Sequence, residues 1–328
     1  MRQIQFQSFG KPEEQATCGE APEPTPSTGE VLVRVLTAPI NPADINYIEG
    51  TYGIKPELPA VPGNEACAEV ISCGDGVEGF APGDQVIFLG RGNLWQDQIA
   101  LSADQLVKIP AGLDPLQACQ LSVNPPTAAL LLTDFQDLPK GSWVAQNAAN
   151  SAVGQAIIQI AKFHGLKTIN FVRRESLIPQ LEALGADVVF LDEKDSVAKA
   201  RELAGDGGPS LVFNAVGGES ALRLMDLLAP QGQMITYGAM SRQSLKVPNS
   251  FLIFKRIVLR GLWVTEWFKE AGTDAVRDLF GELGRLMADG ALKLPVEKVY
   301  PPEEIAAALT HAQRAERDGK IILRFADQ

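Results

Sequence analysis

A segment of small and polar residues from Gln146 to Gly154 has the composition of a phosphate-binding turn. It follows an apolar run and opens an apolar helix, which is where the pyrophosphate of a dinucleotide rests in a nucleotide-binding fold. The usual fingerprint is G-x-G-x-x-G, and here Gly154 holds the last place while Ala149 and Ser151 hold the first two. Because these residues are small, backbone N–H groups can still approach phosphate oxygens at the positive end of the helix. The segment therefore predicts a dinucleotide site.

Two arginines beyond this turn indicate which dinucleotide is bound. We expect the helix to end at His164-Gly165 and a second strand to run from Lys167 to Val172. Arg173 and Arg174 follow that strand, roughly twenty positions after the glycine turn, where a side chain normally contacts the adenosine ribose. A carboxylate there accepts hydrogen bonds from the free 2′-hydroxyl of NAD, whereas arginine pairs with the 2′-phosphate of NADP. We predict NADPH; the alternative interpretation is a solvated basic loop.

Composition limits the classes of partner. The chain has 328 residues, 45% apolar and 21% charged, which is typical of a soluble globular protein with roughly two domains. Its formal net charge is −11, from 29 basic and 40 acidic residues. This charge argues against nucleic acid or an anionic membrane as a partner. A local basic patch could still receive an anionic substrate.

Cysteine and histidine usage argues against a metal centre. The four cysteines are Cys18, Cys67, Cys73 and Cys119. They form no C-x-x-C pair, which favours reduced structural thiols in a cytosol. His164 and His311 are the only histidines, so a histidine-built metal site is excluded. The chain starts with a strand-like segment and no apolar run reaches the length of a membrane span, so we expect a cytoplasmic protein.

The pattern of expected secondary structure changes near residue 128. Before it, short β segments at 30–35, 69–72 and 85–88 are separated by glycine and proline turns, which predicts a small, mostly β barrel-like domain. After it, candidate parallel strands lie at 142–146, 168–172, 187–191, 211–214, 233–237 and 257–262. Helical crossovers between them make a doubly wound α/β sheet with the cofactor at its carboxyl edge. The last strand, 321–325, is expected to return to the first domain.

Short motifs along essentially the whole chain resemble the medium-chain dehydrogenase/reductase superfamily. They are Asn41-Pro42-Ala43-Asp44, Pro62-Gly63-Asn64-Glu65, Pro82-Gly83-Asp84, the turn ending at Gly154, and Leu184-Gly185-Ala186. The resemblance implies a GroES-like catalytic domain over 1–122 plus 297–328, a Rossmann-like NADP-binding domain over 123–296, and a homodimer through the sheet edge.

The zinc alcohol dehydrogenase branch of that superfamily is a poor match. It places a cysteine where this chain has Ala43 or Asp44, and a Gly-His-Glu where this chain has Gly63-Asn64-Glu65. A carboxamide is a poor zinc ligand, and the cysteine-rich structural zinc loop is absent from the sequence. Without zinc there is no Lewis acid to polarise an alcohol or aldehyde oxygen. We therefore expect no zinc and no alcohol dehydrogenation.

Two zinc-free branches remain, the quinone oxidoreductases and the 2-enoyl thioester reductases, and several segments resemble the second. These segments are residues 44–53, Gly63-Asn64-Glu65, Val123-Asn124-Pro125-Pro126-Thr127, Asn150-Ser151-Ala152-Val153, Leu252-Ile253-Phe254-Lys255, and Leu259-Arg260-Gly261-Leu262-Trp263 followed by Trp267. The closest resemblance is thus to enoyl-CoA or enoyl-acyl-carrier-protein reductases.

The resemblance implies that Tyr52 is the catalytic residue. It places Asn46, Asn64 and Trp263 in the substrate pocket. With the phosphate turn and the two arginines, the expected cofactor contacts are Asn124, Thr127, Asn150, Ser151, Ala152, Val153, Gly154, Arg173, Arg174, Tyr237, Gly238, Met240, Leu262, Trp263, Val264 and Lys320.

Simpler interpretations of the pocket residues stay open. Tyr52 could pack over a glycine-flanked turn, Asn46 could be a local cap, and Asn64 could be a turn residue. Trp263 could be a core residue, because it ends a strand expected to be central. Arg91 is a further candidate for a coenzyme A phosphate.

Reduction of a carbon–carbon double bond conjugated to a thioester suits these residues. Hydride must reach Cβ in the correct orientation, negative charge on the thioester oxygen needs hydrogen-bond donors, and a tyrosine hydroxyl can donate to the enolate or deliver the proton to Cα. The leading hypothesis is an NADPH-dependent trans-2-enoyl thioester reductase. The alternatives are an NADPH quinone or enone reductase and a non-catalytic NADPH-binding protein.

Overall fold

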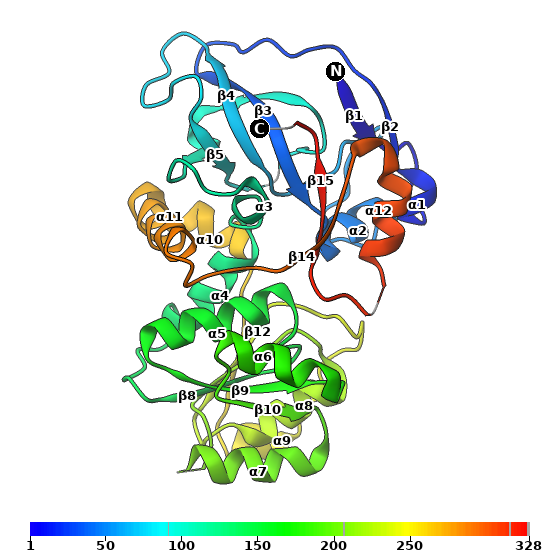
Figure 1. The fold of residues 1–328 in the computed structure, drawn as a ribbon. Coiled ribbons are helices and arrows are strands. Elements are labelled where there is room, and N and C mark those ends of the chain that lie inside the picture. The colour runs from blue at the N-terminus through cyan, green and yellow to red at the C-terminus, as the bar shows by residue number, and fades with distance from the viewer. Residues whose placement is uncertain (91, 206, 315, 327–328) are drawn as a thin grey trace. The chain divides into compact units, whose positions relative to one another are not determined.

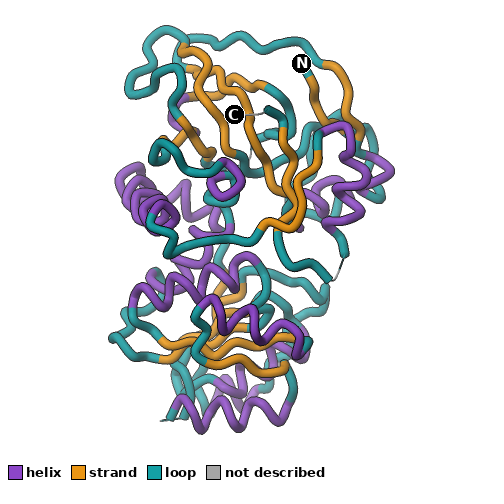
Figure 2. The backbone as a smooth tube through the Cα atoms, in the orientation of Figure 1, coloured by secondary structure: helices purple, strands orange, loops and turns teal. Residues whose placement is uncertain are grey.

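The computed structural model of the chain describes residues 1–90, 92–205, 207–314 and 316–326. The chain divides into two compact units, Met1–Val123 with Phe268–Gln328 and Asn124–Trp267. Strands predominate in the first unit, whereas helices and strands alternate in the second (Figure 2). Arg91, the candidate phosphate contact, lies outside the described residues.

The first unit is built on a seven-stranded sheet with the order β14-β15-β3-β4-β5-β7, in which β6 also pairs with β3. Its central strand is the long β3, whose Val31, Val33 and Val35 are fully buried. A separate antiparallel pair is formed by β1 and β2. The strands of this unit are β1 (Arg2–Gln5), β2 (Thr17–Glu20), β3 (Glu30–Pro39), β4 (Cys67–Cys73), β5 (Gln85–Phe88), β6 (Gln98–Ser102), β7 (Leu106–Lys108), β14 (Val296–Tyr300) and β15 (Lys320–Arg324).

The C-terminal strand returns to the first unit, as the sequence predicts. β15 pairs antiparallel with β3 and parallel with β14, so this unit is made from two distant pieces of the chain. Its helical segments are α1 (Pro12–Gln15), α2 (Pro42–Glu49), η1 (Ala103–Gln105), α3 (Pro115–Ala118), α11 (Gly272–Ala288), η3 (Pro302–Glu304) and α12 (Ile305–Ala312).

The second boundary between the units falls earlier than the sequence analysis placed it. We expected the second domain to run to residue 296, but residues 268–296 belong to the first unit. The side chain of Gln117 bonds both the backbone N–H and C=O of Leu294, each at 2.9 Å. A Cβ at Gly284 of α11 would lie 3.1 Å from Cδ of Pro110, so this helix packs closely on the segment that precedes α3.

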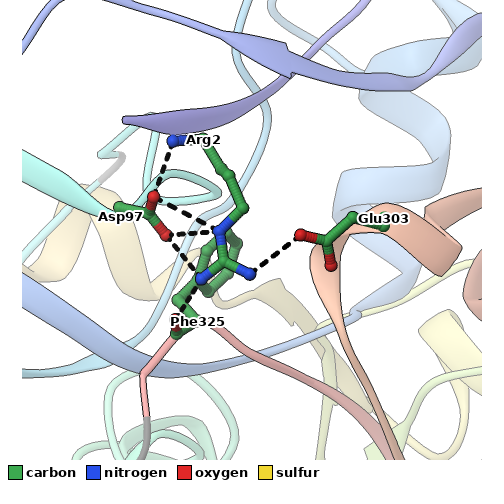
Figure 3. A network of polar contacts seen from close by, with 4 residues as sticks. All are labelled: Arg2, Asp97, Glu303 and Phe325. Atoms are coloured by element: carbon green, nitrogen blue, oxygen red, sulfur yellow. Dashed lines mark hydrogen bonds and ion pairs between the residues drawn. The ribbon is translucent and has the colours of Figure 1, made fainter.

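A charged network holds both ends of the chain in the first unit (Figure 3). The guanidinium of Arg2 donates to Asp97 Oδ1 at 2.9 Å and to Glu303 Oε1 at 2.9 Å. It also donates to the backbone oxygen of Phe325, and the Arg2 N–H donates to Asp97 Oδ2 at 2.6 Å. The hydrogen bonds to Asp97 are the main cause that raises the pKa of Arg2. The network therefore links β1, the residue before β6, η3 and the residue after β15.

The second unit contains a six-stranded parallel sheet with the order β10-β9-β8-β11-β12-β13. Its strands are β8 (Trp143–Gln146), β9 (Lys167–Val172), β10 (Val188–Leu191), β11 (Leu211–Asn214), β12 (Gln233–Thr236) and β13 (Val258–Gly261). All six lie where the sequence predicts strands. Its helices are α4 (Asn124–Thr133), α5 (Ala152–His164), η2 (Glu175–Leu177), α6 (Ile178–Leu184), α7 (Lys194–Ala204), α8 (Gly218–Leu227), α9 (Asn249–Ile253) and α10 (Val264–Glu270), whose last residues cross into the first unit.

Helices cover both faces of this sheet, α5 and α6 on one and α7, α8 and α9 on the other (Figure 1). The alternation of β9 shows the arrangement: Ile169 and Phe171 pack in a core with α7 and α8, while Val172 packs with α5 and α6. Both faces are therefore apolar, as expected for parallel strands with helical crossovers. The strand order matches the doubly wound dinucleotide-binding fold.

Candidate functional site

The strand order of the second unit reverses between β8 and β11. From β8 the chain continues outward through β9 and β10, and β11 then starts the other half, through β12 and β13. In open α/β sheets the ligand crevice lies at the carboxyl ends of the strands at this switch point. The turn after β8 is the segment that the sequence identifies as the phosphate turn.

The first turn of α5 lies directly against this phosphate turn. A Cβ added at Gly154 would lie 2.6 Å from the carbonyl oxygen of Ala149, so only glycine fits. Ser151 is the N-cap, and its hydroxyl accepts the N–H of Gly154 at 3.1 Å. Ala148 adopts a left-handed φ of 49°, an unusual backbone conformation for alanine. The phosphate site thus has a tight backbone turn at the positive end of a 13-residue helix.

Two buried asparagines tie the phosphate turn to the loop after β11. The Asn147 amide donates to Asn214 Oδ1 at 2.9 Å and to Ser220 Oγ at 2.8 Å. Its carbonyl oxygen accepts the N–H of Ala215 at 2.8 Å. Asn214 Oδ1 also accepts the N–H of Gly217 at 3.0 Å. The sequence analysis missed this link; its only signal was an asparagine at the carboxyl end of each strand.

Tyr237 brings a buried hydroxyl towards the phosphate turn. It follows β12, and its N–H donates to the Asn214 oxygen at 3.0 Å. Its hydroxyl is buried and has no hydrogen-bonding partner of normal geometry among the described residues. Burial raises the pKa of Tyr237, and the nearby Ser151 side chain opposes that shift. A buried hydroxyl beside the α5 terminus suits a polar ligand such as a dinucleotide phosphate or ribose.

The two arginines follow β9 as predicted, with Arg173 exposed and Arg174 half-buried. Asp192 lies beside this strand end, because its N–H donates to the Val172 oxygen at 2.8 Å. Its carboxylate already accepts bonds from Arg223 Nε at 2.6 Å and Ser220 Oγ at 2.5 Å. The Asp192 carboxylate is therefore already bound by protein donors, whereas Arg173 and the acidic Glu175 are both exposed after this strand.

The remaining residues of this unit that are expected to contact the cofactor lie on α4 and after β12 and β13. Asn124 and Thr127 are buried in α4, whereas Met240 is 54% exposed. Leu262 donates its N–H to the Thr236 oxygen at 3.0 Å. Trp263 is 44% exposed and follows β13, which is an edge strand. The expectation that Trp263 ends a central strand is therefore wrong, because β13 has a neighbour on one side only. Gly238 and Val264 flank the same strand ends.

Tyr52 lies in the first unit, just beyond the end of α2. This helix starts with a capping box between Asn41 and Asp44 and ends at Gly50, with a φ of 73°. The backbone oxygen of Asn46 then accepts the N–H groups of Thr51 at 2.9 Å and Tyr52 at 3.1 Å. The tyrosine is half-buried on a turn that the helix end fixes.

Tyr47, five residues before Tyr52, has a packing role. It packs edge-on against the Phe6 ring at 5.7 Å in the core of the first unit.

Asn64 and Lys320 belong to a buried polar cluster of the first unit. Asn64 donates its N–H at 3.1 Å and its side-chain amide at 2.5 Å to Asp44 Oδ1. Lys320, 7% exposed, donates to Asn41 Oδ1 at 2.6 Å. Glu65, fully buried, completes the cluster by accepting from Asn41 at 2.6 Å. The roles of Asp44, Asn41 and Glu65 were missed, although each stands in a motif that the sequence analysis quoted.

The described residues contain no group of three or more His, Cys, Asp or Glu side chains placed to hold a metal ion. All four cysteines are free, and burial raises the pKa of Cys67 to about 12. In the same part of the chain, no helix combines the length and apolar character needed to cross a membrane.

The fold and the phosphate turn define a two-domain oxidoreductase of the dinucleotide-binding type. Family models agree: residues 27–111 match the alcohol dehydrogenase GroES-like domain, and residues 152–280 match the zinc-binding dehydrogenase family. The chain is 42% identical over 286 residues to the mitochondrial enoyl-acyl-carrier-protein reductase of Rattus norvegicus, covering 85% of this chain and 77% of that protein. It is also 42% identical over 307 residues to the enzyme of the same name from Xenopus tropicalis, covering 91% and 88%.

Solved structures give the same result. A mutant enoyl thioester reductase from Candida tropicalis superposes with a TM-score of 0.87 at 28% identity, covering 98% of this chain and 99% of that one. A Bacillus thuringiensis protein assigned as an NADPH:quinone reductase gives a TM-score of 0.92 at 28% identity, covering 98% of both chains. The chain belongs to the enoyl reductase branch of the medium-chain dehydrogenase/reductase superfamily.

Replacing Gly154 with alanine tests the phosphate turn. The added Cβ would meet the Ala149 backbone at 2.6 Å, so α5 or the turn must shift and the N–H donors must move. We expect NADPH affinity, measured by fluorescence titration, to fall by about tenfold or more. Gly281→Ala in α11 is the matched control, since a Cβ there meets nothing within 4 Å and should leave affinity unchanged. Equal affinities for both variants would contradict the role given to the turn.

Proposed function

We propose that this chain is an NADPH-dependent trans-2-enoyl thioester reductase that works without zinc. The observation that carries the proposal is its identity of about two residues in five, over most of its length, to proteins named as enoyl-acyl-carrier-protein reductases. A related solved structure, Etr1p with NADP and crotonyl-CoA, has a TM-score of 0.88 and covers 98% of this chain. The position of Tyr52 on a turn fixed by α2 fits the same reaction.

The residues suggest how the reaction proceeds. NADPH supplies a hydride, which goes to Cβ of the enoyl thioester. Ser151, the α5 terminus and the Tyr237 hydroxyl would bind and orient the dinucleotide. As the double bond is reduced, negative charge moves to the thioester oxygen, where a hydrogen-bond donor is needed. The Tyr52 hydroxyl would stabilise this enolate and deliver, directly or through water, the proton that Cα takes up.

We infer zinc independence from the side chains that occupy the relevant motifs. Asn64 is a carboxamide, and its amide group is committed to Asp44. Asp44 and Glu65 are fully buried and accept hydrogen bonds from protein donors. A phenol as acid catalyst needs no Lewis acid. Chelator treatment should therefore leave turnover unchanged.

The NADPH preference is proposed from the arginines after β9. Arg173 is exposed and Arg174 half-buried, while the neighbouring carboxylate of Asp192 is bound by Arg223. Guanidinium groups pair with a 2′-phosphate and gain little from a free 2′-hydroxyl.

The double variant Arg173→Ser with Arg174→Ser tests this preference. We expect kcat/KM for NADPH to fall by about tenfold or more, since charged hydrogen bonds to the 2′-phosphate are lost. With NADH, which lacks that phosphate, kcat/KM should stay within about twofold. Equal losses for NADPH and NADH would contradict the proposal.

The acyl carrier stays open between coenzyme A and acyl carrier protein. One related structure holds crotonyl-CoA, and several relatives are named enoyl-acyl-carrier-protein reductases. A net charge of −11 disfavours an acidic carrier protein unless a local basic patch offsets it. The expected cytoplasmic location also stays a prediction, although several relatives are named mitochondrial.

Tyr52→Phe is the direct test of the chemistry. Loss of the hydroxyl should lower crotonyl-CoA reduction by about 10²–10⁴-fold, the usual contribution of a positioned acid catalyst, while NADPH binding persists. Tyr47→Phe is the matched control, because its ring packs on Phe6 in the core and should retain near wild-type turnover. Wild-type protein that reduces no enoyl thioester would end the proposal.

A quinone or enone reductase is the second candidate, because the Bacillus thuringiensis protein assigned to that activity has a TM-score of 0.92. It predicts quinone turnover far above that of crotonyl-CoA under the same conditions. A protein that binds NADPH but reduces neither acceptor would instead be non-catalytic.

We also propose a homodimer through the edge of the second unit's sheet. β13 is an edge strand, and beside it Phe254 and Ile253 are 83% and 64% exposed while Val258 is 39% exposed. Exposed apolar side chains next to an open strand edge are typical of an interface. A related enoyl thioester reductase from Candida tropicalis forms an Etr1p/Etr2p heterodimer.

Phe254→Asp tests the dimer. A charge in an apolar interface should convert the dimer to monomer, measured as halving of the mass by size exclusion with light scattering. Phe163→Asp is the control, because Phe163 is 58% exposed on α5, away from β13. A monomeric wild-type protein would contradict the proposal.

A further inference from the structure

The buried polar cluster of the first unit joins distant segments of the chain. We call Asn41, Asp44, Asn64, Glu65 and Lys320 the Lys320 cluster. They come from the start of α2, the loop before β4 and the first residue of β15. Asp44 and Glu65 are fully buried and Lys320 is 7% exposed. Ions so far from water cost much free energy to bury, so each one needs its partners in place.

Asn41 is the centre of this cluster, and its orientation is determined. Its Oδ1 accepts from Lys320 at 2.6 Å, and its Nδ2 donates to Glu65 Oε1 at 2.6 Å. An ammonium group can only donate, so the oxygen end of the Asn41 amide must face Lys320 and the NH2 end must face Glu65.

Glu65 is therefore surrounded by donors on both oxygens. Oε1 accepts from Asn41, and Oε2 accepts the backbone N–H of Val123 at 3.0 Å. A carboxylate satisfies both donors, but a protonated acid or an amide presents a donor on one side. Only the ionised form of Glu65 completes the arrangement.

The Lys320 cluster connects to both segments that the proposed reaction needs. The Asn41 N–H donates to Asp44 Oδ2 at 2.8 Å and closes the capping box that starts α2. The other end of α2 holds the Tyr52 N–H through the oxygen of Asn46 at 3.1 Å. On the other side, Val123 directly precedes Asn124, an expected cofactor contact.

We propose that Glu65 is a positioning residue which, through Asn41 and Val123, fixes the segments that carry Tyr52 and Asn124. The proposal rests on the proposed enoyl reductase function. It gives a positioning role in catalysis to a fully buried carboxylate.

The burial of Glu65 and the nearby charge of Lys320 act in opposite directions on the Glu65 pKa, so that its protonation changes near neutral pH. Desolvation by burial raises its pKa to about 7, despite the opposing charge of Lys320. Burial likewise raises the pKa of Asp44 to about 6 and lowers that of Lys320. Cys119, also buried, faces the same groups. Below about pH 7, protonated Glu65 would present a hydroxyl to one of its donors, so the positioned form is favoured as pH rises.

Glu65→Gln isolates this effect, because it keeps the shape and removes one acceptor. We expect kcat with crotonyl-CoA at pH 8 to fall by about tenfold, because the segment that carries Tyr52 loses its fixed position. KM for NADPH should rise as well, because the hydrogen bond that holds Val123, next to Asn124, is also weakened. Wild-type kcat should rise with pH through about 7, and the variant should lack this rise. Glu69→Gln on β4 is the matched control, because Glu69 pairs with exposed Arg34 and should keep the wild-type rate and profile.

The outcomes separate the inference from the proposed function. Wild-type protein that reduces no enoyl thioester ends the function, and amide hydrogen exchange then tests the positioning: Glu65→Gln should expose the Tyr52 and Val123 amides more than Glu69→Gln does. If Glu65→Gln does not fold, the wild-type profile decides, and a kcat that is flat between pH 6 and 8 overturns the proposal. A folded Glu65→Gln with wild-type kcat and profile also overturns it.

Discussion

The amino-terminal turn of α5 approaches the turn after β8 so closely that position 154 has no room for a side chain. The dinucleotide site depends on this contact, because the donors for phosphate oxygens are backbone N–H groups whose positions the turn sets. Asn147 reinforces it by anchoring the turn to the neighbouring strand end through Asn214 and Ala215. The site is thus determined by backbone packing, and small residues in place of two fingerprint glycines still suit it.

The second unit was largely predictable because its parallel strands are buried on both faces and appear as short apolar runs. The positions of the turn after β8 and of the arginines after β9 were also predicted, since they depend on neighbours along the chain; their cofactor contacts stay predictions. The edge position of β13 was not, because strand order is set by pairing between distant segments. The boundary near residue 267 depended on bonds between Gln117 and Leu294, which no local pattern reports.

The first unit uses buried and exposed charge differently. Around Arg2, whose side chain is 37% exposed, ion pairs link chain ends at the surface, where solvent weakens each contact. Around Lys320 the charged groups are almost completely excluded from solvent, so each hydrogen-bond donor needs a protein acceptor. Sequence patterns can identify single residues of this cluster, as they did for Asn64 and Lys320. Which residues pair with them depends on the tertiary structure.

The division of the first unit between the two ends of the chain affects the order of folding. The second unit is one continuous stretch, from Asn124 to Trp267, and has all its strands as soon as it leaves the ribosome. The sheet of the first unit lacks β15 until residues 320–324 are synthesised, so β3 has no partner on that side while residues 40–319 are being added. A domain that is completed last exposes an unpaired strand edge in the nascent chain. Chaperone dependence and sensitivity to removal of β15 should therefore concentrate in the first unit.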